Sequence, residues 1–201
     1  MSNQELINTI ILQSKEILSL DNYKKEIQKL ISNLNEKSLN HIKYTILHKD
    51  AILSLQKDFI NIIPPMNLDN HDRDKIVYYL LLNDTKVASK LHRETMKHHG
   101  FPTTNELCYE IIFDYESAHM TKADKPLSAY DTVIVHHKEL LDVLTPFLKE
   151  LNLWEKSSEY VISYEDMIKN FDSIDDEGLI NEIIKSLKYV SSENFFYDIV
   201  S

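Results

Sequence analysis

The chain is poor in glycine, with only Gly100 and Gly178 among its 201 residues. This scarcity excludes a glycine-rich phosphate-binding loop, which needs several glycines within a short segment. The chain also has no extended alternation of β-branched and polar residues, which is the pattern of a half-buried strand. We therefore predict an all-α protein.

Cysteine is even scarcer, because Cys108 is the only one, and a lone cysteine cannot form an internal disulfide. The first residues, Met-Ser-Asn-Gln-Glu, carry neither the basic nor the apolar part of a signal peptide. No apolar run approaches the ~20 residues of a membrane span. We expect a cytoplasmic protein without a membrane partner.

Positive charge is also in deficit, with 22 lysines and arginines against 32 acidic residues and a formal net charge of -10. This deficit argues against broad nucleic-acid binding and against attraction to an anionic membrane surface. A small substrate, or one whose charge a metal masks, fits better.

The chain is rich in amphipathic helical patterns. Its length and 43% hydrophobic content suit one domain with a core. Apolar residues at helical spacing predict an N-terminal helical hairpin over residues 1–37, with helices at 3–19 and 22–35. The rest divides into a helical core at 38–153 and a C-terminal helical extension at 154–201, packed as one compact domain. The terminal helices offer a surface for a homodimer.

Within this division we predict further helices and their ends. Pro64 and Pro65 close a helix that starts at Leu39, because proline cannot continue a helix. The remaining helices are expected from Thr85 up to Gly100, from Asn105 to about Met120, from Ser128 to about Leu153, and at 163–171 and 178–190.

The stretch His71-Asp72-Arg73-Asp74-Lys75 leads directly into the apolar run 76–82. Imidazole and carboxylate are complementary donors for one divalent metal. Lys75 follows Asp72 by three residues, so on a helix it places a cation beside the pair. The plainer alternative is a helix start, in which Asp72 stabilises the helix dipole and His71 is exposed.

Other histidines flank this stretch. His48 precedes it by a helix and a loop and can return to the same metal, whereas His41 is a weaker candidate. His92, His98 and His99 follow in one expected helical run, where at least two imidazoles can converge on a second metal. Ordinary half-buried or solvated histidines remain the alternative. We interpret the pair at 136–137 as one core-facing and one exposed histidine.

Asp114 follows the apolar residues 111–113. A carboxylate there is costly to bury unless a partner offsets its desolvation, and a metal would be such a partner. In the loop at 121–130, Lys122 and Lys125 are placed where they could hold an anionic substrate, although solvated charges are commoner.

The order His48, His71-Asp72 with Lys75, His92, His98-His99 and Asp114 resembles the metal-binding pattern of the HD-domain superfamily of helical metal-dependent phosphohydrolases. The matching segment covers about residues 41–130. Residues 86–131 also look like an uncharacterised bacterial and phage family within that superfamily. The parts that carry this second likeness are His92-Arg93, His98-His99, the segment 113–118 and the segment 122–130.

The resemblance implies an HD-domain-like helical bundle with one or two divalent ions, which would be Mn, Fe, Zn, Co or Mg. His48, His71, Asp72 and Asp114 would bind the first ion. His92 and one or both of His98 and His99 would bind the second, with Asp72 as the bridge. Only 15 residues separate His99 from Asp114, which leaves open which of the paired histidines reaches metal.

The implied activity is hydrolysis of a nucleotide or other small phosphate ester by an activated water. Asp72 and Lys75 would be the catalytic residues, and Lys75, Arg93, Lys122 and Lys125 would contact the substrate phosphate. Two alternatives stay open, a di-iron oxygenase that uses the same ligands and a non-catalytic helical interaction protein. Arg93 and His98 also have the Rx4H spacing of HEPN ribonucleases, a spacing that arises often by chance.

Overall fold

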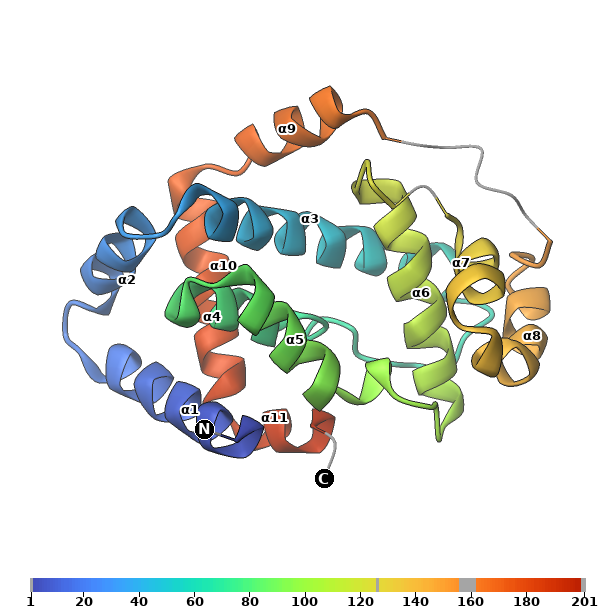
Figure 1. Ribbon diagram of the computed structural model, residues 1–201, viewed down its shortest axis with the longest axis horizontal. Coiled ribbons are helices and arrows are strands. Elements are labelled where there is room, and N and C mark those ends of the chain that lie inside the picture. The colour runs from blue at the N-terminus through green and yellow to red at the C-terminus, as the bar shows by residue number, and fades with distance from the viewer. Residues whose placement is uncertain (1, 126, 156–161, 200–201) are drawn as a thin grey trace. The chain divides into compact units, whose positions relative to one another are not determined.

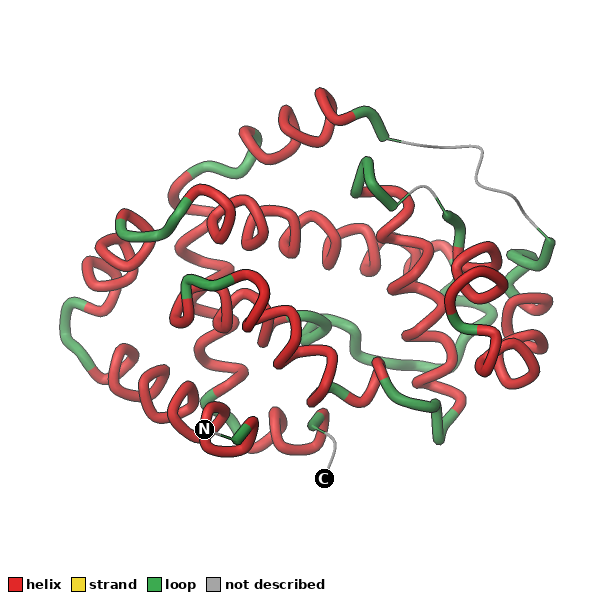
Figure 2. Tube along the Cα trace, viewed as in Figure 1, coloured by secondary structure: helices red, strands yellow, loops and turns green. Residues whose placement is uncertain are grey.

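The computed structural model of the protein describes residues 2–125, 127–155 and 162–199. Pro126, which belongs to the expected lysine loop, lies outside these residues, as do parts of the expected C-terminal extension. Within the described ranges every regular element is a helix (Figure 2). Met96 and Ile199 form an isolated antiparallel bridge. The all-α prediction is confirmed. Nowhere in these ranges is a helix both long and apolar enough to span a bilayer.

The chain forms two compact units that alternate along the sequence. The first unit comprises Met1–Ile46, Asn70–Met96 and Phe171–Ser201, and the second comprises Leu47–Asp69 and Lys97–Asn170. The predicted division at residues 37 and 153 remains a prediction.

In the first unit the two ends of the chain pack together around one central helix. Helix α10 contacts α4, α1 and α2, and α4 also contacts α5 (Figure 1). The apolar core of this unit includes Ile7, Ile27, Ile76 and Ile183, each 0–1% exposed. The elements of this unit are α1 (Asn3–Ser19), α2 (Tyr23–Ser32), the start of α3 (Glu36–Asp58), α4 (Arg73–Leu82), α5 (Thr85–Thr95), α10 (Asp176–Val190) and α11 (Glu193–Asp198).

Helix α4 is buried almost all round, including charged residues of its first turn. Arg73 and Asp74 are buried together with the apolar residues that follow them. A buried guanidinium needs a charged partner, and Arg73 Nη1 donates to Glu182 Oε2 of α10 at 3.1 Å. The predicted apolar run at 76–82 therefore lies in a helix that is buried in the core of this unit.

In the second unit α6 is the central element and contacts η1, α7 and α8. Its apolar core includes Ile52 of α3, Phe113 of α6, Val133 of α7 and Leu148 of α8, each fully buried. The elements are the end of α3, η1 (Lys97–His99), α6 (Asn105–Thr121), α7 (Ala129–His136), η2 (Lys138–Leu140), α8 (Leu141–Glu150) and most of α9 (Tyr164–Asp172).

Two predicted helices end earlier than expected. α5 stops at Thr95, because Met96 turns to extended backbone and bridges Ile199. His98 and His99 therefore lie on a separate 3₁₀ turn, and their expected helical relation to His92 is wrong. α3 likewise ends at Asp58, several residues before the proline pair.

The helix expected from Ser128 to about Leu153 is broken in two. α7 ends at His136, and the backbone of His137 leaves the helical region at φ -134° and ψ 49°. His136 is exposed and His137 is half-buried, with its ring stacked on Tyr115 at 5.2 Å. His136 is therefore the expected exposed member of the pair, and His137 packs on Tyr115, which itself packs against the core of this unit. α11 was not predicted.

Candidate metal centre

Asp72 occupies the N-cap of α4 in an unusual backbone conformation. Its φ of 60° is left-handed, and its side chain caps no helix N–H. The side chain is buried, with Asp72 only 1% exposed. Its Oδ2 accepts a hydrogen bond from Lys75 Nζ, and the two atoms are 2.8 Å apart. Its other oxygen, Oδ1, lies 3.6 Å from His71 Nε2 and 3.1 Å from His92 Nε2. Two imidazoles thus converge on one carboxylate oxygen.

The pKa of Asp72 is held well below its usual value. Burial is the largest single influence and raises the pKa, but the positive charges of Lys75, His71 and His92 together outweigh it. The carboxylate is therefore ionised at neutral pH, as a metal ligand must be.

His92 is held from behind by a second carboxylate. Its Nδ1 lies 2.6 Å from Asp74 Oδ2, and both side chains are 0% exposed. Because an ionised carboxylate only accepts, Nδ1 donates. A neutral His92 consequently presents the lone pair of Nε2 to Asp72 Oδ1. Burial lowers the pKa of His92, but the negative charges of Asp74 and Asp72 raise it above its usual value.

His48 shows the same arrangement in the second unit. Its Nε2 lies 2.9 Å from Asp114 Oδ1, and its Nδ1 lies 3.1 Å from Ser117 Oγ. The Ser117 hydroxyl also lies 3.0 Å from the backbone carbonyl of Asp114, to which it can donate while its oxygen accepts from Nδ1. All three side chains are buried. His48 therefore also directs Nε2 at a carboxylate oxygen.

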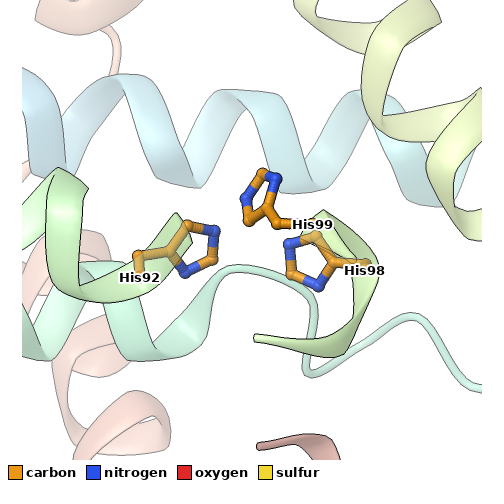
Figure 3. Close-up of side chains that lie close together, drawn as sticks. All are labelled: His92, His98 and His99. Atoms are coloured by element: carbon orange, nitrogen blue, oxygen red, sulfur yellow. The ribbon is translucent and has the colours of Figure 1, made fainter. Parts of the chain in front are cut away.

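The paired histidines lie next to one another on η1. Figure 3 shows the rings of His98 and His99, with His92 drawn at its place on α5. The two adjacent rings are 4.4 Å apart between centroids. His98 is buried and its Nδ1 lies 3.6 Å from Glu110 Oε1, whereas His99 is half-buried. Glu110 precedes Asp114 by one turn of α6.

The predicted substrate contacts are more exposed. The Lys75 side chain is 18% exposed while it holds Asp72. Arg93 is exposed on α5, and Lys125 is exposed in the loop after α6. Lys122 lies 3.5 Å from Asp124. The role of these residues toward a substrate stays a prediction. His41, the weaker candidate ligand, is half-buried with its ring 5.1 Å from that of Tyr79.

Sequence reasoning missed Asp74, Ser117 and Glu110, the three residues whose oxygens face imidazole Nδ1 atoms. A signal was available for Asp74, because it lies at the start of a helix whose next turns, 76–82, are apolar. A charge inside such a helix requires a buried partner. Ser117 and Glu110 gave no comparable signal.

These buried groups fit a divalent metal. Asp72, Asp74 and His92 are all buried and offer ligand atoms within 4.8 Å of one another. In the neutral form of His92, two lone pairs meet across 3.1 Å, which is repulsive unless a proton or a metal ion lies between them. Metal-binding histidines characteristically donate their second N–H to an oxygen, and both His48 and His92 have an oxygen within hydrogen-bond distance of Nδ1. Searches with the chain found no matching protein-family model, curated protein or solved structure.

Proposed function

We propose that the protein is a metal-dependent phosphohydrolase of the HD-domain type, acting on a nucleotide or another small phosphate ester. One observation supports it above the others: His48 and His92 each have Nδ1 held by an oxygen and Nε2 directed at a carboxylate. This is the orientation required of metal ligands. The reaction class comes from the resemblance of the sequence to HD-domain enzymes.

In this proposal the ligands are those that the resemblance implies. His48, His71, Asp72 and Asp114 would hold one ion, and His92 with His98 or His99 would hold a second, with Asp72 between them. Imidazole and carboxylate donors without thiolate suit Mn, Fe, Co, Zn or Mg. A bound divalent ion would supply Lewis acidity and lower the pKa of a water molecule toward neutrality.

Lys75 would have two roles. Its ammonium holds Oδ2 of Asp72, which orients the carboxylate so that Oδ1 faces the imidazoles. Its partial exposure lets the same positive charge stabilise phosphoryl oxygens of a substrate. Arg93, Lys122 and Lys125 would add contacts to the substrate phosphate.

The test is phosphate release from a panel of nucleotides and a model phosphate ester, with Mn, Mg, Co, Fe or Zn added separately. We expect turnover with at least one ion and none in Asp72→Ala, since that variant loses the oxygen that both imidazoles face. Asp166→Ala is the matched control, because Asp166 is exposed on α9 and pairs with Lys169. Absence of turnover across the full panel would contradict the proposal.

Measurements of oxygen consumption, bound metal and melting separate the competing activities. A protein purified aerobically with iron that consumes oxygen, and releases no phosphate, would replace the hydrolase with a di-iron oxygenase. A protein that binds no ion, and whose melting is unchanged by a chelator, would be a non-catalytic helical protein.

A further inference from the structure

Asp74 is a buried carboxylate that the proposed ligand set leaves without a role. Its side chain is 0% exposed and sits in the first turn of α4. Burying a carboxylate is costly unless hydrogen bonds and opposite charge compensate it. Its Oδ2 lies 2.6 Å from His92 Nδ1, and its Oδ1 makes no hydrogen bond to any described residue. The position of Asp74 is therefore tied to His92.

We infer that Asp74 is a positioning residue that fixes the tautomer and ring orientation of His92 and strengthens it as a metal ligand. The inference rests on the proposed function, because it takes His92 as a ligand. When Nδ1–H donates to Asp74, the lone pair of His92 Nε2 points toward Asp72 Oδ1, which lies 3.1 Å from Nε2. An anionic acceptor behind an imidazole raises its basicity as a ligand.

The other two anchored imidazoles have weaker supports. Ser117, behind His48, is a neutral hydroxyl at 3.1 Å. Glu110 lies 3.6 Å from His98 Nδ1, which is beyond hydrogen-bond distance. Of these three supports, Asp74 alone combines a negative charge with a short hydrogen bond. Metal affinity should therefore respond more strongly to neutralising Asp74 than to neutralising Glu110.

The experiment is calorimetric titration of the full chain with Co²⁺, with the visible absorption of the bound ion recorded alongside. Asp74→Asn keeps the shape of the side chain and an acceptor oxygen but removes the charge. We expect a loss of affinity of about 10- to 100-fold and an altered Co²⁺ spectrum. Glu110→Gln should lose less than Asp74→Asn.

Glu182→Gln is the matched control, because Glu182 of α10 accepts a hydrogen bond from Arg73, the residue next to Asp74 in the first turn of α4. It should leave both the affinity and the spectrum unchanged. A double-mutant cycle with His92→Ala completes the design. If Asp74 acts through His92, Asp74→Asn should not lower the Co²⁺ affinity further in a protein that already carries His92→Ala.

The outcomes distinguish this inference from the proposed function. Wild-type protein that binds no Co²⁺ overturns the proposed function, and this inference with it. Wild-type protein that binds Co²⁺ while Asp74→Asn binds it equally well overturns only the role of Asp74. If Asp74→Asn does not fold, nitrogen NMR of the Zn²⁺-loaded wild type decides, since the inference requires the His92 proton on Nδ1. A proton on Nε2 would overturn it.

Discussion

Two residues in left-handed backbone conformation enclose α4. Asp72, at φ 60°, precedes the helix, and Asn83, at φ 48°, follows it. Among residues other than glycine, aspartate and asparagine adopt this conformation most readily. In a chain with two glycines, polar side chains take the positions where glycine is usual, and each then gains a further contact. The Asp72 side chain accepts a hydrogen bond from Lys75, and the Asn83 side chain accepts one from Asn35.

Substitutions of Asn83 should separate its backbone role from its side-chain role. Its Oδ1 accepts from Asn35 Nδ2 at 2.7 Å and from Asn35 N–H at 3.0 Å. Asn83→Gly loses these bonds but keeps the backbone relaxed, so we expect a loss of about 1 kcal/mol. Asn83→Ala adds left-handed strain and should lose about 2 kcal/mol. Urea denaturation measures both variants, and equal losses would show that the backbone conformation carries no cost.

At this scale the sequence predicted ligand types but not their partners. Asp114 could be chosen because a carboxylate beside an apolar run requires compensation. Asp72 could be chosen because it adjoins His71, and His48 because a helix and a loop separate it from that pair. The roles of Asp74 and Ser117 depend on which ring nitrogen faces which oxygen. Ring orientation follows from packing in three dimensions, and spacing along the chain does not contain it.

At the scale of elements, α6 gathers the polar groups of the second unit on one helical face. Glu110, Asp114 and Ser117 follow one another at intervals of four and three residues, so their side chains share a face. Glu110 faces His98, while Asp114 and Ser117 face His48. Another residue of α6, Tyr109, donates its hydroxyl to Glu150 Oε2 of α8 at 2.7 Å.

The contact between Tyr109 and Glu150 should make stability fall at alkaline pH. Burial, the hydrogen bond to Glu150 and the negative charge of Glu150 together raise the pKa of Tyr109 to about 12. The unfolded tyrosine ionises near 10, so the contribution is complete below about pH 10 and is lost as the pH rises through 12.

Thermal melts of wild type and Tyr109→Phe across that pH window test this. The variant should be less stable by about 1 kcal/mol at neutral pH, because one hydrogen bond is removed. The difference should shrink as the pH approaches 12. Other tyrosines with raised pKa, such as Tyr79, are unchanged in both proteins. A constant difference at every pH would contradict the assignment.

Helix identity was predictable from the sequence, whereas several helix ends were not. The apolar periodicity predicted the ends of α1 and α6 to within about one residue, because burial of one helical face sets the spacing of the apolar residues. α5 ends where it does because Met96 pairs with Ile199, a contact with the far end of the chain. The break after α7 depends on the backbone of a single histidine. Local patterns carry no information on either feature.

At the scale of the whole molecule, buried ionisable groups should link stability to metal. The chain carries a net charge of -10, and several of its carboxylates and imidazoles are buried in facing pairs. In the absence of a cation, a neutral His92 with its proton on Nδ1 sets the Nε2 lone pair against Asp72 Oδ1, unless a second proton is bound. A ligand that binds only the folded state adds stability, by ~2.7 kcal/mol at a concentration of 100 times Kd.

We therefore expect divalent cation to raise the melting temperature and a chelator to reverse the rise. The proposed function places Asp72 and Asp114 on one ion, so Asp72→Asn and Asp114→Asn should each abolish the shift alone. Asp166→Asn, on an exposed and ion-paired aspartate, should retain it. Scanning calorimetry with and without Mn²⁺ measures all four proteins. If only one of the two variants loses the shift, Asp72 and Asp114 do not share a cation, because removing either ligand of a common ion must weaken its binding to the folded state.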